Sequence, residues 1–304
     1  MSGDVIVTIT LNAALHVSYA VGSLSQDGVN PVSRPAYLAG GRGVAAARVL
    51  HAFGHDVLAA GLVGGAAGEL IRADLAKSGV PTAFTQIRGE SRRVHTFGGP
   101  DGRTLRFGEP GPYITTEELG RFAADYRKLL AGAAAVVLSG SLPDGLPLDM
   151  YGTLVTYAAE AGVPVVLDAG GQELLHAAAH RPDLVVADAR RVGGDFDLGA
   201  ALIRLGAGAA VVVGEHLVHV ITADGDWTAC IEAPGADATS LTARGALTAG
   251  LVPGQLLGWF WPDRLKHALA LAAAGGAAEL EGSDEVDLAA YEQLLEAVAV
   301  KASA

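Results

Sequence analysis

The chain has 304 residues, half of them hydrophobic, which suffices for a sizeable buried core and excludes a peptide hormone or a disordered tail. Its 33 acidic and 21 basic residues leave a formal net charge of -12, so nucleic acid and anionic membrane surfaces are expected to be poor partners. A single cysteine excludes an internal disulfide, and no apolar run is long enough to span a bilayer. These features predict a cytoplasmic protein.

Short β-branched runs alternate with alanine- and leucine-rich helical periods, the pattern of a parallel sheet with crossover helices. The expected strands are Val5–Thr10, Val57–Leu62, Ala134–Ser139, Val163–Asp168, Leu184–Ala187, Ala209–Val213 and Val218–Thr222. The expected helices are Val44–Phe53, Leu70–Ser78, Leu148–Ala161, Leu241–Trp261 and Asp263–Glu281. Thr115 and Glu118 have capping-box spacing and mark the start of a further helix.

Two stretches break this alternation and predict a small β lid, formed by inserts at about residues 17–37 and 85–108. Turn signals occur within them at Gln26-Asp27-Gly28 and Pro100-Asp101-Gly102. The simplest organisation is one α/β domain over residues 1–304 that carries this lid. Its ligand is expected beyond the carboxyl ends of the strands.

Four motifs follow the expected elements in a fixed order. They are Thr10-Leu11-Asn12-Ala13-Ala14-Leu15-His16, Ala39-Gly40-Gly41-Arg42-Gly43-Val44-Ala45-Ala46-Ala47-Arg48, Glu109-Pro110-Gly111-Pro112 and Leu138-Ser139-Gly140-Ser141-Leu142-Pro143. With these motifs, from about Val5 to Leu295, the chain resembles the PfkB group of ribokinase-like sugar kinases, and within it the 1-phosphofructokinase and tagatose-6-phosphate kinase branch. The resemblance implies a three-layer α/β/α fold with a mostly parallel sheet and a β lid.

The resemblance also implies a substrate side to the site. Its residues here are Asn12, His16, Gly40, Gly41, Arg42, Arg92, Glu109 and Ser139. The glycines, with Gly43, lack a Cβ and can let a sugar phosphate approach backbone amides. Arg92 falls where the family has a phosphate-contacting lid arginine, although two solvated lid arginines, Arg92 and Arg93, are the alternative. His16 and Ala45 replace an aspartate and an asparagine that bind sugar hydroxyls, so the usual ketohexose phosphate is expected to fit poorly.

The kinase side departs further from the family pattern. Gly245 stands where the family has its catalytic aspartate, and no other acidic residue lies between Asp237 and Asp263. Arg244 replaces a glycine whose amide cradles phosphate, and it either supplies a charge there or faces solvent at a helix start. The resemblance places a degenerate nucleotide and anion site at Asp188, Arg191, Gly214, Ala243 and Arg244.

Three hypotheses follow from the contrast between the substrate side, which keeps much of the family pattern, and the kinase side, which has lost most of it. The first is a degenerate kinase homologue that binds a sugar phosphate without normal ATP-dependent phosphotransfer. The second is a divergent active kinase, which uses MgATP and in which Asp188, Glu109 or a substrate carboxyl replaces the lost base. The third is an enzyme of another class that reuses the sugar pocket, with His16, His95 and Glu109 as acid and base. The resemblance further implies a homodimer through the lid.

Other chemistry finds less support. His176 and His180 have the spacing of a helical metal pair but no third ligand nearby, and a structural role is expected for them and for His216 and His219. The Gly41–Gly43 segment lacks the third glycine of a dinucleotide site. No metal site is therefore predicted, and no cofactor is certain.

Overall fold

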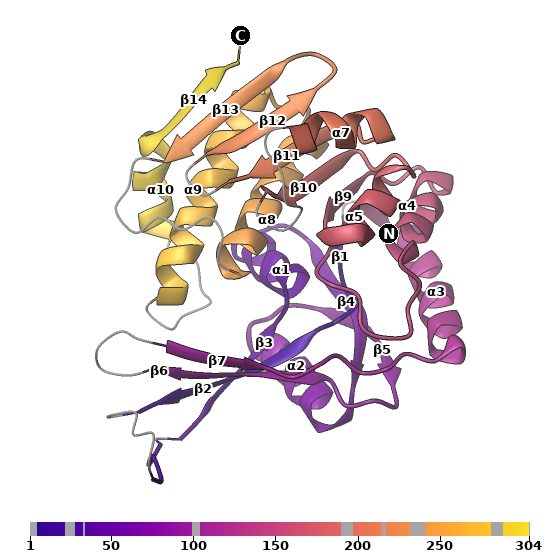
Figure 1. Ribbon diagram of the computed structural model, residues 1–304, viewed down its shortest axis with the longest axis vertical. Coiled ribbons are helices and arrows are strands. Elements are labelled where there is room, and N and C mark those ends of the chain that lie inside the picture. The colour runs from indigo at the N-terminus through magenta and orange to yellow at the C-terminus, as the bar shows by residue number, and fades with distance from the viewer. Residues whose placement is uncertain are drawn as a thin grey trace.

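The structure is a computed structural model that describes residues 5–21, 28–32, 34–98, 104–189, 197–214, 217–231, 241–280 and 288–303. A ten-stranded sheet forms its centre, and a four-stranded sheet stands off from it (Figure 1). In spatial order the large sheet contains β14 (Val298–Ala302), β13 (Asp226–Ile231), β12 (Val218–Thr222), β11 (Ala209–Val213), β10 (Leu184–Asp188), β9 (Val165–Asp168), β8 (Ala133–Ser139), β1 (Val5–Thr10), β4 (Val57–Gly64) and β5 (Thr82–Ile87).

The strand order of this sheet reverses at β1. Neighbouring strands from β11 to β5 run parallel, and the three pairs at the β14 end are antiparallel. The chain leaves β1 toward β4 and β5, then returns to β8 on the other side of β1. In open α/β sheets, ligands bind at the carboxyl ends of the strands beside such a reversal. The ends of β1 and β8 therefore mark the place where a site is expected.

Helices cover both faces of the large sheet. One face packs against α1 (Arg42–Ala52), α2 (Gly65–Lys77), α8 (Leu241–Leu257), α9 (Trp261–Leu280) and α10 (Leu288–Ala297). The other packs against α3 (Thr116–Leu130), α4 (Met150–Glu160), α5 (Gly171–Ala178) and α7 (Asp197–Leu205). Because side chains alternate along a strand, Ile6 of β1 joins the first core while Val7 and Ile9 join the second. The expected three-layer α/β/α fold is confirmed.

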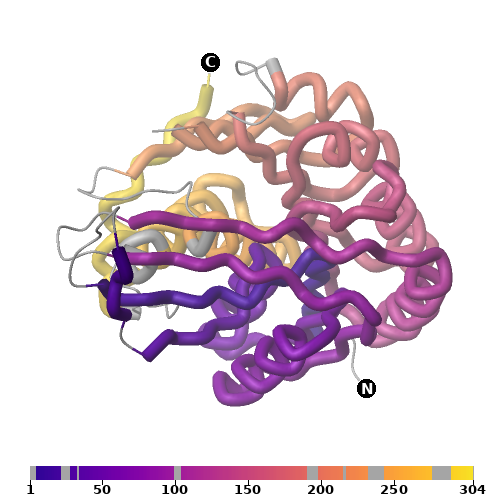
Figure 2. Tube along the Cα trace, turned by 60° about the horizontal axis from the view of Figure 1, so that its bottom comes forward, coloured from indigo at the N-terminus to yellow at the C-terminus, as the bar shows by residue number. Residues whose placement is uncertain are grey.

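The smaller sheet is the lid. It consists of β3 (Ala36–Gly40), β2 (Ala14–Ala20), β6 (Arg92–Gly98) and β7 (Thr104–Gly108), in that order. Figure 2 shows the four strands running side by side. The lid strands start at Ala14 and reach Gly40, beyond the predicted insert at 17–37.

The second predicted insert began too early. Residues 85–87 belong to β5, which pairs parallel with β4 in the large sheet, because Phe84 and Ile87 are buried there. The lid begins only at Arg92. Of the predicted turns, residues 26, 27 and 100–102 lie outside the described ranges.

Helix ends follow local chemistry. The capping box is confirmed, since the amide of Glu118 donates to the Thr115 hydroxyl (3.3 Å) and the amide of Thr115 donates to the Glu118 carboxylate (2.9 Å). Helix α8 ends at Leu257, four residues earlier than predicted, because Gly258 takes a left-handed conformation (φ 66°). None of the described helices combines the length and hydropathy that a bilayer crossing requires.

Candidate functional site

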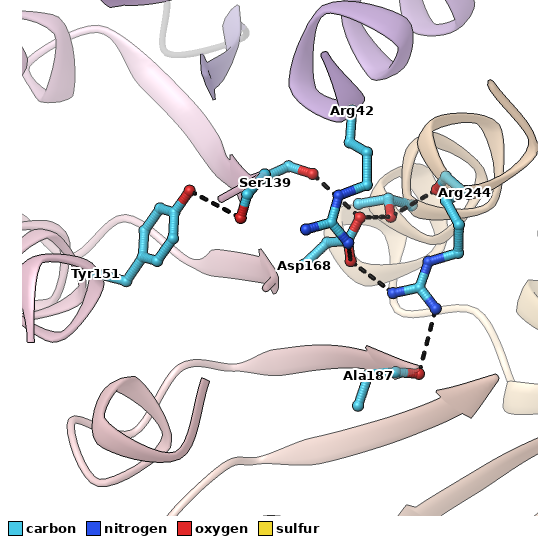
Figure 3. A network of polar contacts seen from close by, with 8 residues as sticks. Arg42, Ser139, Tyr151, Asp168, Ala187 and Arg244 are labelled. Carbon is cyan, nitrogen blue, oxygen red and sulfur yellow. Dashed lines mark hydrogen bonds and ion pairs between the residues drawn. The ribbon is translucent and has the colours of Figure 1, made fainter. Parts of the chain in front are cut away.

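Asp168 is the centre of a buried polar network at the carboxyl edge of the sheet. It ends β9, and no part of it is exposed. Its Oδ1 accepts hydrogen bonds from Arg42 Nη1 (2.7 Å) and Arg244 Nη2 (2.6 Å). Its Oδ2 accepts from the Ser139 hydroxyl (3.1 Å) and lies 3.3 Å from the Thr248 hydroxyl, whose single hydrogen is shared with the carbonyl of Arg244 (2.9 Å) (Figure 3). Both carboxylate oxygens therefore have partners inside the protein.

The two arginines come from the first turns of two helices on the same face of the sheet. Arg42 is the first residue of α1, and Arg244 lies in the first turn of α8. Arg244 also donates to the carbonyl of Ala187 at the end of β10 (3.3 Å). The side chain of Arg42 is 10% exposed, against 3% for Arg244. Of the two alternatives for Arg244, the solvent-facing one is wrong, because the guanidinium is buried against Asp168.

Charge and burial act in opposite directions on Asp168. Burial alone would raise the pKa of its carboxyl, but the charges of Arg244 and Arg42, with the hydrogen bonds from Arg244 and Ser139, lower it below the ordinary value. Asp168 is thus held ionised and saturated, which makes it a poor proton acceptor. Beside it, burial raises the pKa of Tyr151, whose hydroxyl donates to the carbonyl of Gly140 (3.3 Å).

Ser139 was predicted to contact substrate, and the structure uses it differently. It is fully buried and its hydroxyl is bound to Asp168. Two residues further, Ser141 is exposed and its hydroxyl accepts from Asn12 Nδ2 (3.2 Å). Ser141 is therefore the serine of this motif that a ligand can reach.

Gly245, where the resemblance predicts the family's catalytic aspartate, packs against α1. A Cβ added to Gly245 would lie 2.5 Å from the Cβ of Ala45 and 2.9 Å from the carbonyl oxygen of Arg42. The resemblance predicts a polar asparagine at position 45. The small residues at positions 45 and 245 thus lie against each other and allow α1 and α8 to approach closely.

The glycines around the start of α1 are also explained by packing within the chain. An added Cβ at Gly40 would meet the imidazole of His16 (2.3 Å to Nε2). At Gly41 it would meet Thr10 Cγ2 (2.8 Å), and at Gly43 Thr10 Oγ1 (2.4 Å). Gly41 is the N-cap of α1 and has φ 123°, a value that favours glycine. Contact of these glycines with a sugar phosphate stays a prediction.

Arg92 lies where the lid meets the large sheet. Its Nε donates to the carbonyl of Asn12 in the turn between β1 and β2 (3.3 Å), and burial lowers its pKa. The side-chain Oδ1 of Asn12 is buried and has no hydrogen-bond partner among the described residues. A half-buried cation beside an unsatisfied amide oxygen suits a ligand that carries both phosphate and hydroxyl groups.

His16 lies on the same face of the lid as Arg92, and His95 lies on the opposite one. His16 pairs with Val94, so strand alternation turns His95 away from it. His95 instead stacks on Tyr19 (6.1 Å between ring centroids) and lies 3.6 Å from Glu109. The predicted acid and base trio of His16, His95 and Glu109 is therefore wrong.

Glu109 is held at the base of the lid. Its Oε2 accepts from the amide of Arg93 (2.8 Å), and its side chain is 43% exposed. Arg93 also bonds Glu90 (2.7 Å), which accepts from the first-turn amides of Ala66 and Ala67 in α2. This network ties the lid to α2. It leaves Glu109 the most exposed carboxylate of the predicted site.

The predicted nucleotide side is only partly described. Asp188 ends β10 and is buried, as is Ala243 in α8. The amide of Gly214 donates to the carbonyl of Leu217 (2.8 Å). Arg191 lies outside the described ranges. The assignment of these residues to nucleotide binding stays a prediction.

The histidine pair on the opposite face is not arranged as a metal site. Helix α5 ends at Ala178, before His180, and His180 Nδ1 hydrogen-bonds the Thr156 hydroxyl instead (2.9 Å). His216, of the second pair, lies outside the described ranges. The expected structural role of His180 agrees with this contact.

Sequence reasoning missed Asp168 and Thr248. A signal for Asp168 was present, because it ends a buried β-branched strand at the edge where ligands bind. Thr248 had none, since a threonine in an apolar helix is a common packing residue. Their partnership with two arginines depends on tertiary structure.

Comparisons with known proteins agree with this architecture. The family model described as pfkB family carbohydrate kinase matches residues 5–190. A tagatose-6-phosphate kinase from Staphylococcus epidermidis is 38% identical over 173 residues, which cover 56% of this chain and 54% of that protein. The chain thus spans about half the length of the curated relatives it matches.

Solved structures match over nearly the whole chain. A possible 1-phosphofructokinase from Thermotoga maritima has a TM-score of 0.87 at 24% identity, covering 99% of this chain and 100% of that one. Phosphofructokinase-2 from Escherichia coli in complex with fructose-6-phosphate has a TM-score of 0.84 at 20% identity, covering 96% and 98%. The same protein has been solved in a tetrameric inhibited form, with a TM-score of 0.83 at 21% identity and coverage of 96% and 98%. At these identities the likeness shows the fold.

Proposed function

Because the chain belongs to the pfkB family of carbohydrate kinases, we propose that it binds a phosphorylated sugar and transfers a phosphoryl group to it from MgATP. A curated relative is a tagatose-6-phosphate kinase, and a structural neighbour has been solved with fructose-6-phosphate. The residue that carries the proposal is Arg92, a half-buried cation where the lid meets the sheet. Arg92 would hold the phosphate, while Asn12 and Ser141 would meet sugar hydroxyls.

Phosphoryl transfer needs a group that accepts the proton of the attacking hydroxyl. Asp168 is saturated, and Gly245 offers no side chain. Glu109 is the candidate that is most exposed, at 43%; its carboxylate contacts Arg93 and His95 on the lid face opposite Arg92, so it would have to turn toward the sugar to act. In that role its carboxylate takes the hydroxyl proton, the alkoxide oxygen bonds the transferred phosphorus, and ADP leaves. MgATP would lie toward Asp188 and Gly214.

A second candidate function is binding of the sugar phosphate without phosphotransfer. The packing of Gly245 on Ala45 favours it, because protein atoms fill the space that a catalytic side chain at position 245 would need. The family match supports the kinase, and this contact supports the binding protein. Both take the same ligand class.

An ADP-release assay with MgATP and a panel of hexose phosphates separates the two. Steady turnover of tagatose 6-phosphate, fructose 6-phosphate or fructose 1-phosphate that is lost in Glu109→Gln would support the kinase. Thermal stabilisation by a sugar phosphate without turnover would support the binding protein, because a ligand stabilises the state that it binds.

Arg92→Gln is expected to abolish the stabilisation by sugar phosphates, whereas Arg93→Gln, on the opposite lid face, is expected to retain it. Neither turnover nor stabilisation at millimolar concentrations would overturn both readings. Thermal stabilisation by sugar phosphates that is unchanged in Arg92→Gln would also overturn both readings.

The lid also supports a homodimer, as expected from the family resemblance. The lid face that carries His95 presents apolar side chains to solvent, with Tyr37 48%, Leu105 49% and Phe107 59% exposed. A second copy of the chain would cover this face. The cytoplasmic location stays a prediction from composition.

A further inference from the structure

We propose that Tyr151 is a positioning residue for the ligand. Its hydroxyl holds the peptide between Gly140 and Ser141, so that the backbone amide of Ser141 is presented to an oxygen of the bound sugar phosphate. This inference rests on the proposed phosphorylated-sugar ligand and adds to it a backbone donor and the residue that orients this donor. Tyr151 itself does not touch the ligand.

The strand end that precedes this peptide is anchored to β9. The amide of Gly140 donates to the carbonyl of Asp168 (3.1 Å), and the Ser139 hydroxyl donates to the Asp168 carboxylate. The chain leaves the strand at Gly140, whose φ of 119° is a value that favours glycine. Because a residue without a Cβ has several backbone conformations open to it, the bonds to β9 do not by themselves fix the orientation of the next peptide.

Tyr151 supplies the contact that fixes this orientation. It lies in the first turn of α4 and is fully buried, and its hydroxyl donates to the carbonyl of Gly140 (3.3 Å). Within the described ranges, this carbonyl has no other hydrogen-bond partner. Burial raises the pKa of Tyr151, so the hydroxyl keeps its proton and stays a donor.

The amide of Ser141 is turned away from the core that contains Tyr151. The peptide is trans and planar, so the N–H of Ser141 points in the direction opposite to the carbonyl of Gly140. Tyr151 approaches the strand end from the side opposite to Arg42 and Asp168 (Figure 3). Ser141 is exposed, and its hydroxyl accepts from Asn12 Nδ2 (3.2 Å).

The Ser141 amide therefore lies beside the side chains that are proposed to meet the sugar. Across the part of the chain that the structure describes, this amide makes no hydrogen bond of its own. Sugar and phosphate oxygens both accept hydrogen bonds, so an N–H suits either of them and a carbonyl oxygen repels a phosphate.

Loss of the Tyr151 hydroxyl would free the peptide to rotate at Gly140. The ligand would then meet a mixture of orientations, some of which present the Gly140 carbonyl in place of the Ser141 amide. Binding would have to select the productive orientation at an entropic cost. The hydroxyl is thus expected to act on ligand affinity without contact to the ligand.

The test compares Tyr151→Phe with Tyr126→Phe by titration calorimetry, using fructose 6-phosphate, tagatose 6-phosphate and fructose 1-phosphate as separate probes. Tyr126 is the matched control, because it is also fully buried and its hydroxyl donates to a backbone carbonyl, that of Leu154 (3.2 Å). Both variants are expected to melt at a lower temperature than the wild-type chain. Only Tyr151→Phe is expected to raise the dissociation constant, by about tenfold, at a temperature where both variants are folded.

The amide proton resonance of Ser141 gives a second, direct measurement. In the wild-type chain it is expected to shift downfield on saturation with a hexose phosphate, since the N–H gains an acceptor. The shift should be smaller in Tyr151→Phe and unchanged in Tyr126→Phe. This measurement on the wild-type chain decides the matter even where Tyr151→Phe does not fold.

The two levels of the proposal fail in different ways. Equal dissociation constants for Tyr151→Phe and Tyr126→Phe, or a Ser141 amide that does not respond to a bound hexose phosphate in the wild-type chain, would overturn the role of Tyr151 alone. Failure of all three hexose phosphates to bind the wild-type chain would overturn the phosphorylated-sugar ligand and this inference with it.

Discussion

At the scale of single residues, Asp168 is the position with the largest expected effect on stability. Asp168→Asn leaves two buried guanidinium groups without a counter-charge and is expected to lower the free energy of unfolding by about 3–5 kcal/mol. Arg244→Met leaves a one-to-one pair of Asp168 and Arg42, so a smaller loss is expected. Urea unfolding at pH 7 measures both. An equal or larger loss in Arg244→Met would contradict the role of Asp168 as the shared counter-ion.

Gly245 provides a second prediction at this scale. Gly245→Asp introduces the carboxylate that the family resemblance predicts at this position. The carboxylate cannot take up a catalytic position, because the Cβ of the new side chain would overlap Ala45 and the backbone of α1. We expect a loss of about 1–3 kcal/mol in unfolding free energy and no gain in ADP release. Thermal unfolding and the kinase assay measure the two effects.

Gly120→Asp is the matched control for this change. Gly120 lies on the exposed side of α3, and nothing lies within 4 Å of an added Cβ. Little change in stability is expected there. A stable Gly245→Asp variant with new kinase activity would show that the close contact between α1 and α8 is wrong.

The sequence predicted which residues of the site are unusual, but it did not predict their surroundings. Gly245 and Arg244 were recognisable as departures from a motif. Whether Arg244 faces solvent or the core depends on Asp168, which is 76 residues away in the chain. Long-range pairs of this kind leave no trace in local periodicity. The hydrogen bond between Ser139 and Asp168 is another such pair, and without it the sequence predicts that Ser139 contacts substrate.

At the scale of elements, His267 links α9 to α10 and α1. Its Nδ1 hydrogen-bonds the Tyr291 hydroxyl (2.7 Å), and its ring meets Phe53 and Trp259 edge-on. Burial, with a like charge on His55, lowers the pKa of His267. The folded chain therefore favours the neutral imidazole.

The pH dependence follows from this lowered pKa. Above the unfolded-state value of about 6.5, His267 is neutral in both states and its contribution to stability is complete. As the pH falls below about 6.5, the unfolded chain binds the proton first, so stability decreases. Melting temperatures between pH 8 and pH 5 are expected to fall less in His267→Gln than in the wild-type chain. His176→Gln, outside this cluster, should keep the wild-type slope, and parallel curves for all three proteins would refute the assignment.

Elements were predicted best where one periodicity dominates. Strands such as β1 and β11 are apolar and buried on both faces, and their bounds match the prediction. The pattern predicts residues 85–87, the end of β5, as part of the lid because they resemble the alternation that continues in β6. Two strands of different sheets separated by only four residues are not distinguished by alternation, and pairing with β4 decides the matter.

At the scale of the whole molecule, the exposed lid face is expected to control assembly. The wild-type chain should have twice the monomer mass in light scattering at micromolar concentration. Phe107→Glu places a charge on the apolar face and is expected to yield monomers. Phe260→Glu, at a residue 82% exposed between α8 and α9, should leave the mass unchanged. A monomeric wild-type chain would rule out the dimer.

The overall architecture was the most predictable feature, because alternation of strands and helices specifies a parallel sheet with two helical layers. The last two strands at one end of the large sheet, β13 and β14, were missed. They have few β-branched residues, and β14 follows α10 without a break. β13 pairs with β12 and β14 pairs with β13, so their place in the sheet comes from these contacts rather than from local preference.

The placement of the tryptophans has a spectroscopic consequence. All three, Trp227, Trp259 and Trp261, lie on β13 and around the start of α9, where Trp227 stacks on Trp261. None lies on the lid or beside Asp168. Intrinsic tryptophan fluorescence of this protein is therefore expected to follow unfolding around β13 and the start of α9. It is not expected to change when a sugar binds beneath the lid. A tryptophan introduced at Phe97 would give the lid an optical signal of its own.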